Sequence, residues 1–497
     1  MTTFRILNFG CRASQADGAS IRSELLNAGF AEANGDGFSD LAVLNTCTVT
    51  ATADAEVRQI IRRIHRDHPD CRVLVTGCYA QRAPAEIASL PGVAWVVGNS
   101  HKHLIPEVLS GGQGTHVAPH GQQENPVRTL PSHLWARGTG GEGVAETVAK
   151  ERGSNEAARP TQPLGLRFFS DQTETWVGEI SENFHFQPVS CDDRTRPTLK
   201  IQDGCNARCS FCIIPAVRGR SRSLPPDAVV AQVRALEEKG YREVVLSGIN
   251  LGSYGLDLQP RTSFLSLLDR ILAQSSLPRV RISSIEPMDV RSELIRLVAM
   301  EPRMAQHFHV PLQSGCDRTL RQMNRRYWTT HYAERILAIR EMIPNCGIGA
   351  DVMVGFPGET PADHSASVRF IDSLPFTYLH IFPYSARPST PAAARSDQLN
   401  GRIAHERSVE LRVLIARKRR DFMQRQVGQV LSALTLNEAH PAGTIALSSN
   451  YLKITLPETR VPPNQMVDIR IDRAEKDCLA GRDPSVQSVL HGCPATA

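Results

Sequence analysis

The stretch QDGCNARCSFCIIP, residues 202–215, places three cysteines within eight positions. Their spacing is C-x3-C-x2-C, and the residues are Cys205, Cys209 and Cys212. A structural zinc site usually needs four ligands in two CxxC-like pairs, and a thioredoxin-like motif uses one CxxC pair. An iron–sulfur cluster is normally held by four thiolates. Three thiolates therefore predict a cluster with one iron left open, where a substrate or cofactor binds. Three independently buried cysteines are the alternative.

A second set of cysteines follows strand-like segments near the N-terminus. FRILNFGC, LAVLNTC and RVLVTGC are mostly apolar runs that end at Cys11, Cys47 and Cys78. Helix-like stretches lie between them, and strands that alternate with helices predict a parallel sheet. Ligands gather at the carboxyl ends of the strands in such sheets. We therefore expect these cysteines to meet at one sheet edge and to hold a second three-thiolate cluster. Three unrelated buried cysteines are again the alternative.

Length, charge and cysteine content indicate the class of protein. The 497 residues suggest about three domains. The sequence has no apolar run of roughly 18 residues and no signal-peptide layout, so we expect a cytoplasmic protein without a membrane span. Disulfides are not expected in the reducing cytosol. A net charge of +5 permits a nucleic-acid partner without requiring one. The cysteines that show no ligand spacing are Cys71, Cys191, Cys316, Cys346, Cys478 and Cys493.

The three-cysteine motif, with Phe211 before its third cysteine, resembles the signature of radical S-adenosylmethionine (SAM) enzymes. In that superfamily the amino and carboxylate groups of SAM fill the open iron position. One electron from the cluster then cleaves SAM to a deoxyadenosyl radical, which is cofactor chemistry that the protein orients and shields.

The presence of two cysteine triads narrows the resemblance to the methylthiotransferases. The resemblance implies an α/β protein with an N-terminal parallel-sheet cluster domain, a radical SAM partial (β/α)6 barrel and a C-terminal small β-barrel, the TRAM domain. The segments that look like motifs of the family are NTCTVT (45–50), VTGCYAQ (75–81), IQDGCNARCSFCIIP (201–215), RGRSRS (218–223) and DVMVGFPGET (351–360). CTVT, RGRSRS, SSIEP (283–287) and IFPYSARPST (381–390) look most like the branch that acts on threonylcarbamoyladenosine in tRNA.

Residues from about 196 to 390 read as repeated strand–helix units, which fits the implied barrel. Parallel barrels place their chemistry on the loops that follow the strands. Phe211 is either core packing or a wall beside the adenine of SAM. The polar residues at strand ends that we consider as SAM contacts are Ser247, Asn250, Ser283, Glu286, Gln313 and Asp351. Ordinary loop capping is the alternative for each of them.

The remaining segments define the predicted domain organisation. The cluster domain spans 1–111, the radical SAM domain 193–423 and the TRAM domain 424–485. Residues 112–192 are rich in Gly and polar residues, which predicts a flexible insertion in which 166–180 could form a local hairpin.

A basic segment, residues 402–425, lies between the predicted barrels. It has eight Lys or Arg against three acids, so it is either a solvated helix face or a phosphate-binding surface for RNA. The short alternating segments after it predict a small β-barrel whose own charge is near neutral.

The resemblance implies radical methylthiolation of the adenine C2 carbon of N6-threonylcarbamoyladenosine next to the anticodon of tRNA. It implies two [4Fe–4S] clusters, one on each cysteine triad, SAM as a second cofactor, and a low-potential electron donor such as flavodoxin or ferredoxin. Isopentenyladenosine in tRNA and an aspartate on a ribosomal protein are the alternative substrates. An iron–sulfur RNA-binding protein without turnover is the alternative from another class, but binding alone would not need an open iron.

Overall fold

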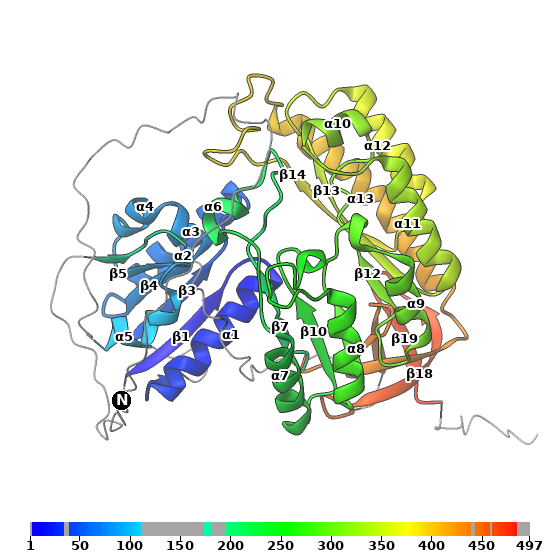
Figure 1. Ribbon diagram of the computed structural model, residues 1–497, viewed down its shortest axis with the longest axis horizontal. Coiled ribbons are helices and arrows are strands. Elements are labelled where there is room, and N and C mark those ends of the chain that lie inside the picture. Colours follow the sequence, from blue (N-terminus) through cyan, green and yellow to red (C-terminus); the bar gives the residue numbers. More distant parts are fainter. Residues whose placement is uncertain are drawn as a thin grey trace, which may run out of the picture.

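The computed structural model describes residues 2–33, 39–110, 173–180, 186, 195–438, 443–457 and 460–484. Figure 1 shows three parts: an N-terminal sheet with its helices (blue), a larger strand–helix layer (green to yellow) and a small barrel (red). No helix in these ranges is both long and apolar enough to cross a membrane.

The N-terminal part is a parallel sheet covered by helices on both faces. Its strands, in spatial order, are β2 (Ala31–Glu32), β1 (Thr3–Asn8), β3 (Leu41–Thr46), β4 (Arg72–Gly77), β5 (Val93–Gly98) and β6 (Glu174–Trp176). The helices are α1 (Arg12–Asn27), α2 (Ala51–Asp67), α3 (Cys78–Arg82), α4 (Pro84–Ala88), the short 3-10 helix η1 (Lys102–Leu104) and α5 (Ile105–Leu109). Strands β3 and β5 are buried along their whole length, as expected for strands covered on both faces. The predicted parallel-sheet domain is thus confirmed.

The strand β6 belongs to the segment for which the sequence predicts a flexible insertion with a local hairpin. In the structure β6 pairs in parallel with β5, and it is the edge strand of the N-terminal sheet. Two polar contacts hold it in place: Gln81 donates to the carbonyl of Gly178 at 2.9 Å, and Thr173 donates to that of Val93 at 2.8 Å. This part of the segment therefore continues the sheet. Residues 111–172 lie outside the described ranges, so their flexibility stays a prediction.

Deletion of residues 115–165 is expected to leave the fold intact, because it spares β6. Extending the deletion through residue 178 removes Trp176, which packs on the core beneath the sheet. Burying an apolar side chain contributes about 1.5–3 kcal/mol when complete, and Trp176 is only partly buried. We expect the longer deletion to lower the melting temperature by about 2–8 °C and the shorter one to leave it unchanged, as measured by circular dichroism. A loss of soluble protein with the shorter deletion would contradict a flexible insertion.

The middle part contains six parallel strands in two three-stranded sheets. They are β7 (Thr198–Lys200), β10 (Glu243–Ser247), β11 (Arg279–Ile282), β12 (His307–His309), β13 (Gly347–Val354) and β14 (Tyr378–Pro383). A bridge between Val280 and Met304 connects the two sheets next to β12, so the strands follow one another in chain order as in an open barrel. The small antiparallel pair β8 (Gln202–Asp203) and β9 (Arg222–Ser223) flanks the three-cysteine loop. The predicted partial barrel is confirmed.

Helices follow each strand of this barrel. They are α6 (Ile214–Arg218), α7 (Pro226–Glu238), α8 (Phe264–Gln274), α9 (Ser292–Met300), α10 (Asp317–Gln322), α11 (Thr329–Met342), α12 (Pro361–Ser373) and α13 (Gly401–Gln424). The sequence specifies closely where some of these helices begin. At α12, Thr360 accepts from the backbone of Asp363, whose carboxylate accepts in return from the backbone of Thr360, and Pro361 occupies the first turn. This capping box fixes where the loop after β13 ends.

The C-terminal part is a closed five-stranded barrel, as predicted. Its strands are β15 (Val430–Thr435), β16 (Gly443–Ser448), β17 (Lys453–Pro457), β18 (Met466–Ala474) and β19 (Leu479–Arg482). The last strand has no separate signal in the sequence, because a short Gly-containing segment follows a turn and shows no alternation.

The C-terminal barrel packs against the amino ends of β10 and β11, opposite to the ends where parallel barrels carry their chemistry. Arg281 is fully buried and donates to the carbonyls of Ser449 and Ser448, at 3.0 and 3.2 Å. Its guanidinium also pairs with Glu243 at 2.7 Å, and Arg279 approaches the same carboxylate at 3.5 Å. Glu243 is thus the buried counter-charge of the two arginines that contact the C-terminal barrel.

Candidate active site

The loop of Cys205, Cys209 and Cys212 follows β8 and lines an open cavity of about 990 Å³. The backbone N–H of Ala207 donates to the Cys205 sulfur at 3.3 Å, and the N–H of Cys212 donates to the carbonyl of Cys209 at 3.1 Å. Ser210 ties the loop to the barrel through the carbonyl of Met323. The structure therefore brings the three predicted thiols together around one space.

Burial makes two thiols of this loop, Cys205 and Cys212, poor acids. Burial raises the pKa of Cys212 to about 12, and it also raises the pKa of Cys205. Arg325 donates to the Cys209 sulfur at 3.3 Å and forms an ion pair with Glu286. Because a metal ligand must be deprotonated, binding of a cationic cluster would drive the protons off these thiols. The residues present fit an iron–sulfur cluster with three thiolates.

A second cavity of about 360 Å³ adjoins the first and shares residues 206–209 with it. Its walls include Asn250 and Glu286, two of the residues predicted to contact SAM, together with Arg325 and Tyr327. Asn250 partly offsets the rise that burial causes in the pKa of Cys205, and its Oδ1 atom is buried without a hydrogen-bond partner among the described residues. A zwitterionic cofactor beside the three thiols would need a carboxylate, a cation and an amide as partners. Glu286, Arg325 and Asn250 supply these groups in this cavity.

The other predicted SAM contacts do not line either cavity. Ser247 is the last residue of β10, and its carbonyl accepts from the N–H of Ile201 at 2.9 Å. Within the described ranges, the Ser283 Oγ and the Gln313 Oε1 are buried and have no partner. Phe211 packs edge-on against Phe356, with ring centroids 6.5 Å apart, inside a small apolar cluster. The structure therefore supports core packing for Phe211.

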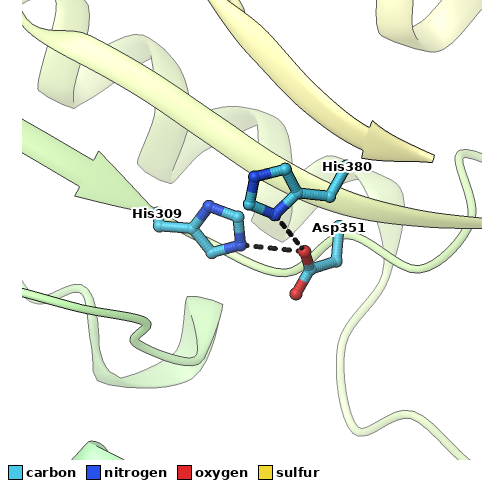
Figure 2. A group of neighbouring side chains, drawn as sticks. All are labelled: His309, Asp351 and His380. Atoms are coloured by element: carbon cyan, nitrogen blue, oxygen red, sulfur yellow. Dashed lines mark hydrogen bonds and ion pairs between the residues drawn. The ribbon is translucent and has the colours of Figure 1, made fainter. Parts of the chain in front are cut away.

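Asp351 lies between two histidines rather than at a cavity wall (Figure 2). His309 Nε2 and His380 Nδ1 approach the same carboxylate oxygen, at 3.0 and 3.2 Å. Burial alone would raise the pKa of Asp351, but the contacts with His309 and His380 hold it well below its usual range. The Tyr378 hydroxyl contacts His309 Nδ1 at 3.0 Å. Asp351 thus has partners from β12 and β14, and the structure gives no support for its predicted contact with SAM.

The N-terminal cysteines follow three neighbouring strands of the sheet, as the sequence predicts. Cys47 comes directly after β3 and Cys78 directly after β4, while Cys11 caps the start of α1 after β1. Burial raises the pKa of Cys47 to about 12, and its proximity to Cys78 and Cys11 adds to the shift. Gly10 has φ +99°, and a Cβ there would meet the Cys47 side chain at 2.3 Å. Only glycine lets the two chain segments approach so closely. The donor set fits a second three-thiolate cluster.

Two contacts beside this second triad come from distant parts of the chain. Asn99, which follows β5, donates to the Cys78 sulfur at 3.5 Å and to the carbonyl of Val217 at 2.8 Å. Arg12, the residue after Cys11, donates to the Tyr451 hydroxyl of the C-terminal barrel at 2.9 Å. Residues next to the N-terminal cysteines therefore contact both other parts of the molecule.

The short helix α6 connects the two triads. It begins two residues after Cys212 and ends at Arg218, and at 1.5 Å per residue its five residues span about 7 Å. Ile213 and Val217 pack against Cys78. The two predicted cluster sites are thus neighbours across one helix.

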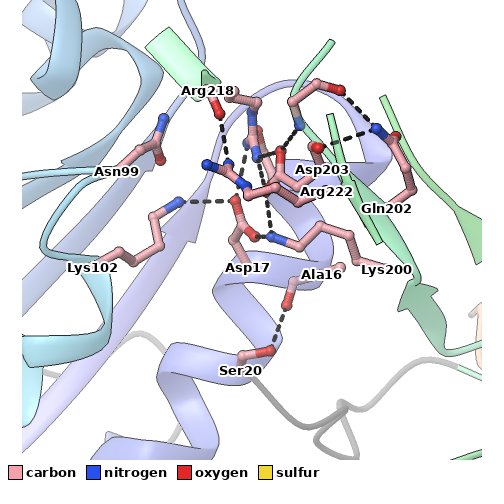
Figure 3. A network of polar contacts seen from close by, with 12 residues as sticks. Ala16, Asp17, Ser20, Asn99, Lys102, Lys200, Gln202, Asp203, Arg218 and Arg222 are labelled. Carbon is pink, nitrogen blue, oxygen red and sulfur yellow. Dashed lines mark hydrogen bonds and ion pairs between the residues drawn. The ribbon is translucent and has the colours of Figure 1, made fainter. Parts of the chain in front are cut away.

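Arg218 belongs to a buried network of charges between α1 and the three-cysteine loop (Figure 3). It donates to both carboxylate oxygens of Asp203 at 3.0 Å and to Asp17 at 3.0 Å. Lys102 contacts Asp17 at 2.8 Å, and Lys200 contacts Asp203 at 2.8 Å and also pairs with Asp17. Burial alone would raise the pKa of Asp203, but Arg218 and Lys200 lower it to about 2. The network holds the N-terminal sheet against the barrel.

The sequence motifs do not point to these charged residues, although the sequence holds one signal for them. Residues 13, 14, 16, 17, 18, 20, 21 and 25 form the buried face of α1, and Asp17 lies in the middle of it. A carboxylate on an otherwise buried helix face needs a charged partner, because burial of an unpaired charge is costly. Arg218 is the first residue of the quoted RGRSRS segment, but its partner on α1 lies 201 positions away.

The basic segment after the barrel is helix α13, and several of its charges are already engaged. Arg407 is buried in an ion pair with Glu359. Arg417 pairs with Asp372 at 2.6 Å, and Lys418 donates to the carbonyl of the same residue at 2.7 Å. The structure therefore favours a packed and partly solvated helix. Phosphate contacts by α13 stay a prediction.

Two family models match the chain. The model of the radical SAM superfamily matches residues 199–371, and the model described as uncharacterized protein family UPF0004 matches residues 3–98. The first match covers the three-cysteine loop and most of the barrel strands, and the second covers the three N-terminal cysteines.

Curated relatives match the chain over nearly its whole length. Threonylcarbamoyladenosine tRNA methylthiotransferase MtaB of Bacillus subtilis is 32% identical over 479 residues, which are 95% of this chain and 94% of the relative. The MtaB of Aquifex aeolicus is 33% identical, with coverages of 90% and 94%. The tRNA-2-methylthio-N(6)-dimethylallyladenosine synthase of Desulforamulus reducens is 30% identical, with coverages of 96% and 94%.

A solved structure shares the fold. The radical S-adenosylmethionine methyltransferase TsrM from Kitasatospora setae superimposes with a TM-score of 0.50 at 17% identity, covering 79% of this chain and 74% of that one. This likeness concerns the arrangement of strands and helices alone.

Proposed function

Because the chain belongs to the radical SAM tRNA methylthiotransferases, we propose that it attaches a methylthio group to C2 of N6-threonylcarbamoyladenosine in tRNA. The observation that carries the proposal is the match to relatives named for this substrate over at least nine tenths of this chain. The sequence motifs CTVT, RGRSRS and SSIEP support the same branch.

The enzymes of this family use two [4Fe–4S] clusters and SAM. We assign Cys205, Cys209 and Cys212 to the cluster beside SAM, and Cys11, Cys47 and Cys78 to the auxiliary cluster. When bound, the first cluster and SAM supply the one-electron chemistry that an aromatic C–H bond requires, since such a bond offers no easy acid–base route.

The residues of this chain then bind and orient the reactants. The smaller cavity would hold SAM, where Arg325 is positioned to contact a carboxylate and Glu286 an ammonium group. The larger cavity carries the side chains of Arg208, Arg220 and Arg222 on its wall. A cavity lined by several arginines suits the phosphates of an RNA that presents a base to the thiol loop.

Two alternatives differ in the substrate. A dimethylallyladenosine-modifying relative is also similar to the chain, so that base is the first alternative. The arginines on the wall of the larger cavity favour tRNA over the second alternative, an aspartate on a ribosomal protein. The flavodoxin- or ferredoxin-like electron donor and the cytoplasmic location stay predictions.

The decisive experiment is mass spectrometry of tRNA nucleosides from a strain that lacks this gene and from the same strain complemented with it. We expect the 2-methylthio derivative of threonylcarbamoyladenosine to be lost and then restored, with its unmethylthiolated precursor accumulating in between. Complementation with the triple variant Cys205→Ala, Cys209→Ala, Cys212→Ala serves as the inactive control. Loss of the methylthio derivative of dimethylallyladenosine instead would assign the other branch, and unchanged tRNA would contradict a tRNA substrate.

A further inference from the structure

Among the described residues, the charges buried between the N-terminal sheet and the barrel do not balance. Two carboxylates, Asp17 and Asp203, face three cations, Lys102, Lys200 and Arg218. The side chains are between 1% and 11% exposed, so water screens the charges little. This set has one positive charge in excess, and burial of an unmatched charge is unfavourable.

The excess charge lies next to the N-terminal cysteines. Arg218 is 2% exposed, and Cys78 and Cys11 are among the groups that act on its charge. One of its terminal nitrogens approaches the Ser14 hydroxyl at 3.4 Å, and that hydroxyl lies 3.6 Å from the Cys11 sulfur. The Arg218 Nε–H is buried and has no hydrogen-bond partner among the described residues. A buried donor of this kind needs an acceptor, and the described residues do not supply one.

We infer that Arg218 is the counter-charge of the auxiliary cluster and sets its reduction potential. The inference rests on the proposed assignment of Cys11, Cys47 and Cys78 as cluster ligands. A [4Fe–4S] core with two positive charges and three thiolates has a net charge of about −1, which matches the excess of about +1 in the network. The cluster thus completes the charge balance of the interface, and Arg218 is a positioning residue that touches neither SAM nor the base.

Two consequences follow from this arrangement. A nearby buried cation favours the electron-rich form of a cluster, so Arg218 raises the midpoint potential of the auxiliary cluster. Because Arg218 also pairs with Asp17 and Asp203, cluster binding stabilises the contact between the N-terminal sheet and the barrel. The reconstituted protein should therefore gain more thermal stability over the cluster-free protein than a variant without this charge.

The test compares Arg218→Gln and Arg218→Lys with the unaltered protein, all reconstituted anaerobically. Potentiometric titration followed by electron paramagnetic resonance should show a more negative midpoint for the auxiliary cluster in Arg218→Gln, a smaller change in Arg218→Lys, and no change for the other cluster. Arg407→Gln is the matched control, since it removes another buried arginine, which lies in α13, from its ion pair with Glu359. Lys102→Met, which takes one charge from the same network, should shift the midpoint in the same direction.

The outcomes separate the inference from the assignment on which it rests. If Arg218→Gln retains about eight irons and its auxiliary midpoint equals that of the unaltered protein, the counter-charge role is wrong. A purely structural salt bridge would lower the melting temperature equally with and without clusters and leave both midpoints unchanged. If the unaltered protein binds only about four irons, the auxiliary cluster assignment itself fails.

Discussion

Replacing Cys205, Cys209 and Cys212 together by alanine is expected to abolish SAM cleavage and to halve the iron content. The unaltered protein should hold about eight irons after anaerobic reconstitution, four in each cluster. The triple variant removes every thiol from the wall of the larger cavity, while Cys11, Cys47 and Cys78 stay in place across α6. Iron analysis and chromatographic detection of deoxyadenosine measure the two effects.

The auxiliary triad provides the matched comparison. Replacing Cys11, Cys47 and Cys78 by alanine should also halve the iron, yet SAM cleavage to deoxyadenosine should remain measurable. Methylthiolated product should disappear in both variants. Full iron content in the second variant would refute the auxiliary cluster, and residual SAM cleavage in the first would refute the assignment of the cavity thiols.

Glu243→Gln is expected to destabilise the protein by about 3–5 kcal/mol, because it leaves Arg281 buried without a counter-charge. Glu243 is fully buried, as is Arg281, and Arg279 is 4% exposed. Arg281 and Arg279 both donate to residues of the C-terminal barrel, so we expect that barrel to be the first part released. Urea unfolding and limited proteolysis measure these effects. Glu301→Gln, which removes a partly exposed ion pair with Arg303, should cost less than about 1 kcal/mol.

The Glu243 carboxylate should make the stability of the protein depend on pH, in a direction that its pKa shift determines. Burial would raise its pKa, but Arg281 and the neighbouring arginines lower it from 4.5 to about 2. A group whose pKa is lowered by folding contributes stability above its unfolded pKa and loses it as the pH falls through the folded value. We therefore expect the stability of the unaltered protein to fall between about pH 5 and 2 by roughly 3 kcal/mol more than that of Glu243→Gln. Equal slopes for the two proteins would contradict the pKa shift.

The strand-then-cysteine pattern predicts the placement of the N-terminal cysteines well because it combines two local signals. A buried parallel strand reads as an apolar run, and the residue after it must lie at the carboxyl edge. Cys47 and Cys78 follow their strands directly, so their placement needs no long-range information. The neighbouring order of β1, β3 and β4 comes from how the crossovers pack, which the pattern does not contain.

The same reasoning brings only two of the candidate SAM contacts to the wall of the smaller cavity. Asn250 and Glu286 stand in loops beyond their strands and reach the cavity, whereas Ser247 and Asp351 lie within strands, where alternate side chains face opposite sides. Sequence position alone does not decide which side faces the cofactor. The charge network is hard to predict for a different reason: its members come from four separate segments, and apart from Asp17 each looks like an ordinary surface charge.

The contacts around the N-terminal cysteines also set an order of events during synthesis. Asp17 meets Arg218 across 201 positions, and Arg12 meets Tyr451 across 439. At about 5–20 residues per second, a ribosome needs roughly 10–40 s to make the first partner and roughly 20–90 s to make the second. The thiols of Cys11, Cys47 and Cys78 therefore leave the ribosome long before their surroundings exist. Iron that reached these thiols on the nascent chain would meet an open site, because the Asp17–Arg218 contact beside them can form only after Arg218 has been made.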